Sequence, residues 1–208
     1  MALRAVIFDY GMVLTGQPDL DAHAEMVRIS GLPAEHFERL YWADRHAYDE
    51  GKLNGITFWN RILKDANLPP SAVAQFNAAD TRMWGTTNPG MVTWQAALKQ
   101  HGLKTAILSN MGDSIHEHIT RAHAWITNFD VLVWSYELHV AKPEPEIYLH
   151  TLRQLAVQPQ EALFLDDKIE NIAAARALGI RGIQFSTIDK LRADLLAAGL
   201  DAELPLPA

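Results

Sequence analysis

The chain contains no cysteine, and this absence excludes several kinds of chemistry at once. Without a thiol there is no disulfide framework, no thiolate nucleophile and no zinc site built on thiolates. Long apolar runs are absent too: none approaches the ~18 residues that a membrane-spanning helix needs, and the first run ends at an acid instead of a signal-peptide cleavage site. These absences predict a soluble, cytoplasmic protein that has no membrane partner.

Positive charge is also scarce. The 208 residues carry 18 Lys and Arg against 25 Asp and Glu, a formal net charge of -7, which argues against nucleic acid as a partner. What is present is an ordinary globular composition, 49% hydrophobic and 21% charged. This length suffices for one large domain or for a core with a modest insertion, and it leaves the oligomeric state open.

The stretch from residue 4 to residue 16 organises the rest of the chain. Its apolar residues Ala5 to Phe8 predict a buried strand, which stops at Asp9, a charge that a continuing buried strand does not tolerate without a partner. Gly11 and Gly16 then allow turns that other residues resist. A carboxylate at the carboxyl end of a buried parallel strand lies where open α/β sheets place their chemistry. The alternative for Asp9 alone is a helix cap or a turn residue.

Helical periodicity without any strand marks the next part of the chain, residues 17–86. Its apolar residues predict four helices, near residues 20–27, 37–48, 57–66 and 73–83. Four helices that follow a single strand predict a small helical bundle inserted into a larger fold.

Helices and strands alternate after this insertion. Further strands are predicted at residues 104–108, 130–133, 162–165 and 181–185. Such alternation gives a parallel sheet with right-handed crossovers. The predicted fold class is therefore α/β, a doubly wound Rossmann-like parallel sheet core with an inserted α-helical cap. The core domain comprises residues 1–16 and 87–208, the cap domain comprises residues 17–86, and the tail at 204–208 is expected to fray.

Polar side chains follow three of the predicted strands: Asp9, Ser109 with Asn110, and Asp166 with Asp167. Because parallel strands end at the same edge of a sheet, we expect these groups to meet there. Carboxylates in one crevice repel unless their pKa values rise or a cation binds. Mg²⁺, which prefers oxygen ligands, is the natural cofactor.

A lysine completes the predicted arrangement. Lys142, followed by Pro143, lies in the loop after the third strand and is positioned to reach the same edge. A carboxylate beside a metal ion, a lysine and a hydroxyl resembles a phosphoryl-transfer site, in which Asp9 attacks phosphorus and forms an aspartyl-phosphate. Ser109 and the main-chain N–H of Asn110 then bind the phosphate.

Four motifs occur in order along the chain: Phe8 to Leu14, Leu108-Ser109-Asn110, Lys142-Pro143-Glu144, and Phe164 to Asp167 with Asn171. On these motifs the chain resembles the haloacid dehalogenase superfamily of hydrolases over essentially its whole length. It is most similar to the bacterial sugar-phosphate phosphatases related to glucose-1-phosphate phosphatase, in the segments that begin at Lys142 and at Asp166.

This resemblance implies a role for each motif. Asp9 is the nucleophile, and Lys142 balances the charge of the reacting groups. Ser109 and Asn110 hold the phosphate of a small phosphorylated substrate, while Asn171 supports the site. The metal set is Asp9, the main-chain carbonyl of Gly11, Asp166 and Asp167, the last of which orients metal-bound water. The cap closes over the substrate and excludes water, and the peptide bond before Pro143 is expected to be cis.

Position 11 departs from the pattern of most phosphatases in the superfamily, which carry a second aspartate there as general acid and base. Gly11 keeps the carbonyl for the metal but offers no proton. General acid–base catalysis contributes about 10²–10⁴-fold in rate. The glycine therefore indicates a slower enzyme, or a substrate whose leaving group needs little help from an acid.

The predicted cap contains two further candidates, Arg45 and His46. They form a substrate-binding surface or, alternatively, belong to an ordinary amphipathic helix. The aromatic residues around them, Tyr41, Phe58 and Trp59, are expected in the cap's own core.

Two other functions remain open at this stage. The first is a hydrolytic 2-haloacid dehalogenase on the same fold, with Asp9 displacing halide from carbon. That branch needs no metal, lacks the pair of acids at 166 and 167, and carries a tyrosine two positions after the nucleophile, whereas Tyr10 is adjacent to it. The second is a non-catalytic binding module that lost its activity with the glycine at position 11.

Overall fold

The computed structural model describes residues 2–206, and within this range five parallel strands form one sheet. They are β1 (Ala5–Phe8), β2 (Lys104–Ser109), β3 (Val131–Trp134), β4 (Ala162–Asp166) and β5 (Arg181–Gln184). The order β3-β2-β1-β4-β5 places the first strand in the centre, and the chain winds outward from it in both directions. This confirms the predicted fold class, and each predicted strand overlaps an observed one.

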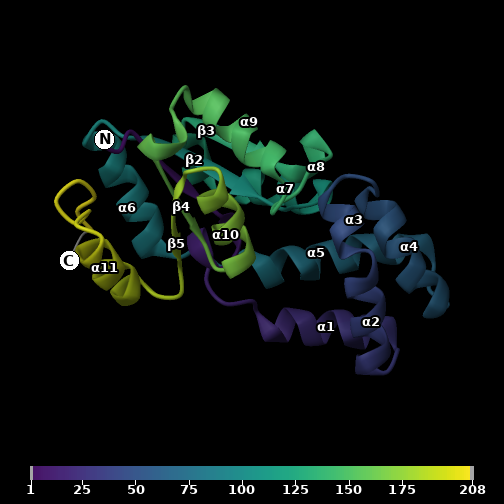
Figure 1. Ribbon diagram of the computed structural model, residues 1–208. Helices are drawn as coiled ribbons and strands as arrows, with labels where there is room; N and C mark the ends of the chain where they lie inside the picture. The colour runs from purple at the N-terminus through teal and green to yellow at the C-terminus, as the bar shows by residue number, and fades with distance from the viewer. Residues whose placement is uncertain (1, 207–208) are drawn as a thin grey trace.

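Helices cover both faces of the sheet (Figure 1). They are α6 (Pro89–Gln100), α7 (Asp113–Ala122), α8 (Ser135–Leu138), α9 (Pro145–Leu155), α10 (Ile169–Ala177) and α11 (Ile188–Ala197), with short turns η3 (Ala124–Asn128) and η4 (Pro159–Glu161). The side chains of β1 point alternately to the two faces of the sheet: Val6 and Phe8 pack with α6, α7 and α11, whereas Ala5 and Ile7 pack with α9 and α10. Burial on both faces explains why β1 is apolar throughout.

The chain between β1 and α6 is helical, as predicted. It forms α1 (Leu20–Ser30), α2 (Ala34–Ala43), α3 (Arg45–Asp49), α4 (Gly55–Asp65), η2 (Pro70–Ala72) and α5 (Val73–Trp84). The single helix expected at 37–48 is wrong in one respect, because the structure breaks it at Asp44, whose carboxylate pairs with Arg61 of α4 at 2.5 Å. Figure 1 shows α1 to α4 gathered at one side of the sheet, away from both chain termini.

The inserted helices bury a group of aromatic residues that belongs to the same apolar core as one face of the sheet. Tyr41, Phe58 and Trp59 are at most 1% exposed, which confirms the prediction that they are core residues. The Tyr48 and Phe58 rings stack with centroids 4.6 Å apart, and the Trp59 and Phe76 rings at 4.9 Å. Stacked and edge-on pairs of this kind add stability beyond the area they bury.

An antiparallel bridge and several hydrogen bonds fix the inserted helices relative to the sheet. Thr15 bridges Thr87, and the Gly16 N–H donates to the Thr86 carbonyl at 2.7 Å. Further along, the Ser114 N–H donates to the Tyr48 hydroxyl at 3.2 Å. The ring of Tyr48 lies so close to Gly112 that a Cβ added there would be 2.1 Å from it, so only glycine permits this approach. The insertion is thereby held against the carboxyl end of the sheet.

The end of the chain differs from the expectation of a frayed tail. Leu204 is fully buried, and Leu206 packs against the same apolar core, because these two leucines complete the surface that α11 leaves open. The prediction was wrong for this part of the tail, and residues 207 and 208 lie outside the described range. Among the described residues, no helix is both long enough and apolar enough to cross a membrane.

Candidate active site

Three neighbouring strands bring their polar ends together. Asp9 follows β1, Ser109 ends β2 and Asp166 ends β4, and β1 pairs directly with both of the other strands. The register places Phe8 beside Ile107 and Leu165, so the residues that follow emerge at one edge. The expected meeting of these groups is therefore present in the structure.

A buried ammonium group links two of these carboxylates. Lys142 Nζ lies 2.8 Å from Asp9 Oδ1 and 2.7 Å from Asp166 Oδ2, and its side chain is only 1% exposed. We call these three residues the Lys142 cluster. The ammonium also lies 5.5 Å from the centre of the Phe164 ring, a second favourable contact for a buried cation. Burial alone would lower the pKa of Lys142, but Asp166 and Asp9 outweigh that effect and raise it, so the lysine stays charged.

Two asparagines hold the cluster in place. The Asn110 side chain accepts from the Lys142 N–H and donates to the Lys142 carbonyl, both at 2.8 Å. The Asn171 amide donates to both oxygens of Asp166 at 3.0 Å. The peptide bond between Lys142 and Pro143 is cis, as expected. The Asn110 side chain therefore positions the lysine. The phosphate contact predicted for this residue falls to its main-chain N–H.

Three carboxylates gather at the same point. Asp9, Asp166 and Asp167 each offer an oxygen, and these atoms lie within 4.8 Å of one another. Burial raises the pKa of Asp9 to about 7; Lys142 opposes that shift, while Asp166 and Asp167 add to it. Burial, with a contribution from Asp166, also raises the pKa of Asp167. One ammonium cannot neutralise three carboxylates, so the donor set fits a hard divalent cation such as Mg²⁺.

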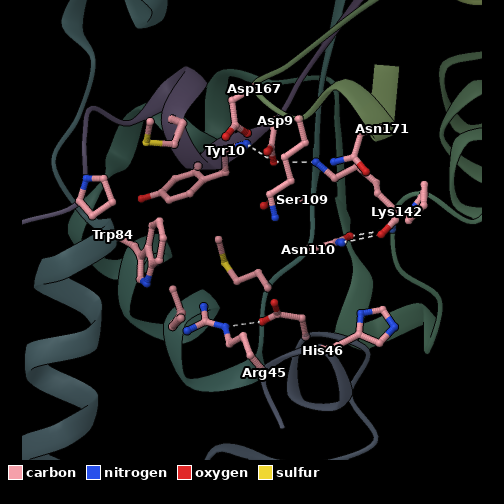
Figure 2. A pocket seen from close by; sticks show the side chains of 18 of the residues that line it. Asp9, Tyr10, Arg45, His46, Trp84, Ser109, Asn110, Lys142, Asp167 and Asn171 are labelled. Atoms are coloured by element: carbon pink, nitrogen blue, oxygen red, sulfur yellow. Dashed lines mark hydrogen bonds and ion pairs between the residues drawn. The ribbon is translucent and has the colours of Figure 1, made fainter. Parts of the chain in front are cut away.

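A cavity of about 640 Å³ opens over this edge of the sheet, and its size is typical of small-molecule sites. It is lined at one end by Asp9, Gly11, Ser109, Asn110, Lys142 and Asp167. Figure 2 shows Asp9, Ser109 and Asp167 together at this end, with Arg45 and His46 at the opposite end. All the candidate residues from the sequence line this cavity except Asp166, which lies fully buried beneath it.

Arg45 and His46 differ in their surroundings. The Arg45 guanidinium bonds Asp49 through Nε at 3.0 Å, donates to the Tyr41 hydroxyl, and lies 3.6 Å from Asp80. His46 has a 69% exposed side chain and lies 3.4 Å from Glu50. Arg45 is therefore built into the inserted helices, whereas His46 is open to the cavity and to solvent.

The turn after β1 determines how Asp9 faces the cavity. Residues Tyr10–Leu14 form one wide turn, η1, in which Met12 adopts φ 62°, a conformation that side chains rarely take. The Asp9 Oδ1 accepts from the Tyr10 N–H at 2.7 Å, and Met12 donates to Thr15 Oγ1 at 3.1 Å. Gly11 has ordinary extended angles, and a Cβ added to it would meet no atom within 4 Å. The space that an acid would fill at position 11 is open.

Several cavity residues had little or no signal in the sequence. The structure adds Met12, Asp49, Trp84, Met111 and Ile115 to the lining, and Trp42 of the inserted helices lines it together with Arg45 and His46. Apolar residues such as these have the spacing of ordinary core positions, and only the packing of the inserted helices over the sheet turns them toward a cavity. Asp49 is one turn after Arg45, a spacing that favours an ion pair on a helix and was the one available indication.

Comparison with known proteins identifies the family. A model of the haloacid dehalogenase-like hydrolases matches residues 3–179. The chain belongs to this family of hydrolases. The resemblance noted on the four motifs is therefore confirmed at the level of the family, while the likeness to sugar-phosphate phosphatases stays a prediction.

Two relatives of this HAD-like hydrolase are phosphatases by name. The sesquiterpene phosphatase astK of Aspergillus oryzae is 26% identical over 187 residues, which cover 88% of this chain and 90% of astK. The phosphatase MT3486 of Mycobacterium tuberculosis is 27% identical over 195 residues, which cover 87% of this chain and 86% of that protein.

Solved structures share the fold of the HAD-like hydrolase. The HAD family enzyme BT-2542 of Bacteroides thetaiotaomicron, crystallised with magnesium and inorganic phosphate, superimposes with a TM-score of 0.76 at 21% identity, covering 88% of this chain and 94% of that one. The L-2-haloacid dehalogenase of Xanthobacter autotrophicus superimposes with a TM-score of 0.66 at 20% identity, covering 95% and 84% of the two chains. At this level of identity, both likenesses show a common fold and nothing more specific.

Proposed function

We propose that this protein is a Mg²⁺-dependent phosphatase that hydrolyses a small phosphorylated metabolite through an aspartyl-phosphate on Asp9. The observation that carries the proposal is the Lys142 cluster at the floor of the cavity, with Asp9 Oδ1 2.8 Å from the ammonium and a third carboxylate, Asp167, beside it. The phosphatase names of two relatives and the magnesium and phosphate bound to BT-2542 support it.

The residues present fit a magnesium ion. Asp9, Asp166 and Asp167 offer only oxygen atoms, and Gly11 lines the same cavity. When bound, the ion would neutralise carboxylate and phosphate charge and so allow the two anions to approach each other. We assign the ion to Asp9, the Gly11 carbonyl and Asp166, with Asp167 orienting bound water.

In the first step, the free oxygen of Asp9 forms a bond to phosphorus while the bond from phosphorus to the ester oxygen breaks. The leaving alcohol keeps the electron pair of that bond. Because Gly11 offers no acid, the alcohol oxygen takes its proton from water. Lys142 holds Asp9 at the correct angle and offsets the charge on the transferring group, and Ser109 with the Asn110 N–H binds the phosphate oxygens.

In the second step, water attacks the same phosphorus and the bond to Asp9 breaks. The products are inorganic phosphate and the regenerated Asp9 carboxylate, and the proton released by the water passes to solvent. Residues 17–86 act as the cap domain over the core of residues 1–16 and 87–208. The hydrogen bond between Tyr48 and Ser114 holds this cap against the sheet, where it keeps bulk water from the acyl-phosphate.

The test is phosphate release from a panel of sugar, alkyl and aryl phosphates, with Mg²⁺ or with EDTA. Turnover that needs Mg²⁺ and is lost in Asp9→Asn supports the proposal, and a rapid acid quench should show one phosphoryl group on the Asp9 peptide by mass spectrometry. Asp189→Asn, an exposed acid at the start of α11, is the matched control and should behave as wild type.

The proposal would be contradicted if folded protein releases no phosphate from any ester in the presence of Mg²⁺. Halide release from 2-haloacids without a metal would then favour the dehalogenase alternative. If Asp9→Asn changes no measured reaction at all, the non-catalytic module becomes the better interpretation.

A further inference from the structure

One wall of the cavity is apolar. It is formed by Tyr10, Met12, Trp42, Trp84, Met111 and Ile115. These side chains come from η1, from α2 and α5 of the insertion, from the segment that follows β2 and from α7. Figure 2 shows Tyr10 and Trp84 along this side of the cavity, between the carboxylates at one end and Arg45 at the other. The wall therefore extends from the proposed phosphate site toward the cap.

Two of these residues keep an open apolar surface. Trp42 is 50% exposed, although its indole N–H is bonded to Glu38 at 2.8 Å, and Trp84 is partly exposed while its indole N–H donates to the Tyr41 hydroxyl at 3.2 Å. Trp59, in the same set of helices, is fully buried. Large aromatic side chains with satisfied polar atoms and an uncovered ring, placed on a cavity, are typical of a binding surface.

Arg45, the cation in this half of the cavity, already has partners within the inserted helices. Arg45 bonds Asp49, and its guanidinium lies 5.3, 5.8 and 5.8 Å from the centres of the Tyr41, Tyr48 and Trp84 rings. Because these partners belong to the insertion itself, the guanidinium is held away from the role of a general binder of hydroxyl groups. Along the wall itself a sugar would place most of its hydroxyls against rings and thioethers that offer them no hydrogen bonds, because the Tyr10 hydroxyl is buried and the open polar side chain, His46, lies at the far end of the cavity.

We infer that the cavity takes phosphate monoesters whose alcohol part is apolar, a hydrocarbon chain or ring that lies against this wall while the phosphate lies at the strand ends. The inference rests on the proposed function for the position of the phosphate and goes beyond it in naming the substrate class. It departs from the expectation of a sugar phosphate. It also makes Trp42 a specificity-determining residue, because its ring is the most exposed part of the wall.

Binding of alkylphosphonates tests this without any chemistry, because their carbon–phosphorus bond is not hydrolysed. Calorimetry with wild-type protein and Mg²⁺ should show affinity rising about two- to fourfold for each methylene from methyl- to hexylphosphonate, the gain expected for partly to fully buried CH₂ groups. Trp42→Ala should flatten the series. Leu196→Ala, which removes a 65% exposed apolar side chain of α11, is the matched control and should leave it unchanged.

Trp42→Gln provides a second variant that keeps a long side chain and an amide donor toward Glu38. It should flatten the series as Trp42→Ala does while keeping the wild-type thermal midpoint. A wild-type series that is flat from methyl to hexyl, or tighter binding of glucose 6-phosphate than of hexylphosphonate, would overturn the inference.

Turnover separates this inference from the proposed function. Ethyl, butyl and hexyl phosphate have leaving groups of nearly equal acidity, so kcat/KM that rises along the series reports recognition of the chain and not ease of bond breaking. Binding that strengthens with chain length but without any phosphate release would overturn the phosphatase and leave the inference standing. Phosphate release that is independent of chain length would overturn the inference and leave the proposed phosphatase activity standing.

Discussion

Two buried cations lie on opposite sides of one cavity, and each is held by two carboxylates. Lys142 is paired with Asp9 and Asp166 at the sheet edge. Arg45 is paired with Asp49 and Asp80 in the insertion, at 3.0 and 3.6 Å; we call these three residues the Arg45 cluster. Both cations have side chains that are at most 11% exposed. The two clusters are alike in composition and differ in how completely each one is satisfied.

The Arg45 cluster is closed by its own neighbours. The Tyr41 hydroxyl donates to Asp80 at 2.6 Å and accepts from both Arg45 and Trp84, and aromatic rings cover the guanidinium. The Lys142 cluster instead has a third carboxylate, Asp167, against it, and the pKa of Asp9 is raised to about 7. A buried ionic group with all its partners serves the fold, whereas one with surplus charge at a cavity is prepared for a ligand.

The largest expected effect comes from breaking the Lys142 cluster. Lys142→Met should lower kcat by about 10²–10³-fold, the usual cost of removing one preorganised charge-stabilising group. Arg45→Met removes the other buried cation and should change kcat by less than about tenfold, because its contacts are to the insertion and not to the reacting atoms. Steady-state kinetics on the best ester of the panel measures both. Equal losses in the two variants would contradict the distinction between the clusters.

Gly11→Asp should raise kcat instead of lowering it, because it adds the missing general acid beside the Lys142 cluster. The open space at Gly11 and its ordinary backbone angles allow the side chain without strain. We expect kcat for alkyl phosphates to rise about 10²-fold, the low end of what general acid–base catalysis contributes, and kcat for aryl phosphates to rise much less.

Gly11→Asn is the matched control, since it has the same shape and no proton to give. A plot of rate against leaving-group pKa should be steep for wild type and for Gly11→Asn and shallower for Gly11→Asp. If the two variants behave alike, the glycine is not what limits the reaction.

The Lys142 cluster was accessible to prediction because its signals are local. Apolar runs end at Asp9 and Asp166, and a parallel sheet has only one carboxyl edge where such ends can meet. The lysine was placed by its loop and by the family motif. The strands were predictable for the same reason, since burial on both faces requires an uninterrupted apolar segment.

The Arg45 cluster and the apolar wall were not predictable in this way. Arg45 and Asp80 are 35 residues apart, and nothing in the helical periodicity of either segment indicates that the helices turn these side chains toward each other. Trp42 follows the pattern of an amphipathic helix, so its position on the cavity depends on the break at Asp44 and on how α2 packs beside α5. Leu204 was misjudged for a similar reason: the proline residues near it predict a loop, but burial is decided by the apolar surface that the loop covers.

Mg²⁺ should stabilise the folded protein through the carboxylates of the Lys142 cluster and not through those of the Arg45 cluster. Mg²⁺ at a hundred times its Kd stabilises the folded state by about 2.7 kcal/mol, which raises the thermal midpoint of a protein of this size by about 5–11 °C. Asp166→Asn should abolish this rise because it removes a ligand. Asp80→Asn, the equally buried acid of the Arg45 cluster, should keep it. Scanning calorimetry with Mg²⁺ and with EDTA measures the difference; a rise that survives Asp166→Asn would place the ion elsewhere.

The smallest expected effect concerns Asp9 in the absence of metal. Its pKa is about 7 in the folded protein and 3.8 as the reference value for an unfolded chain. Between these values the folded state binds more protons than the unfolded state, so stability falls as the pH rises from about 4 to 7 and stays low above that range. In EDTA at pH 8, Asp9→Asn should therefore raise the thermal midpoint by about 2–4 °C, the shift that about 1 kcal/mol causes in a protein of this size.

The pH dependence shows whether this gain comes from the charge of Asp9. At pH 4 the wild-type carboxyl is protonated in the folded state, so the advantage of Asp9→Asn should shrink toward zero, while Asp189→Asn should show no such trend. Lys142 remains paired with Asp166 in the variant, so no cation is left uncompensated. An advantage that persists unchanged at pH 4 would mean that packing and not charge separates the variants. In that case the charge of Asp9 would not destabilise the folded protein, and the electrostatic argument for a cation bound between the carboxylates would fail.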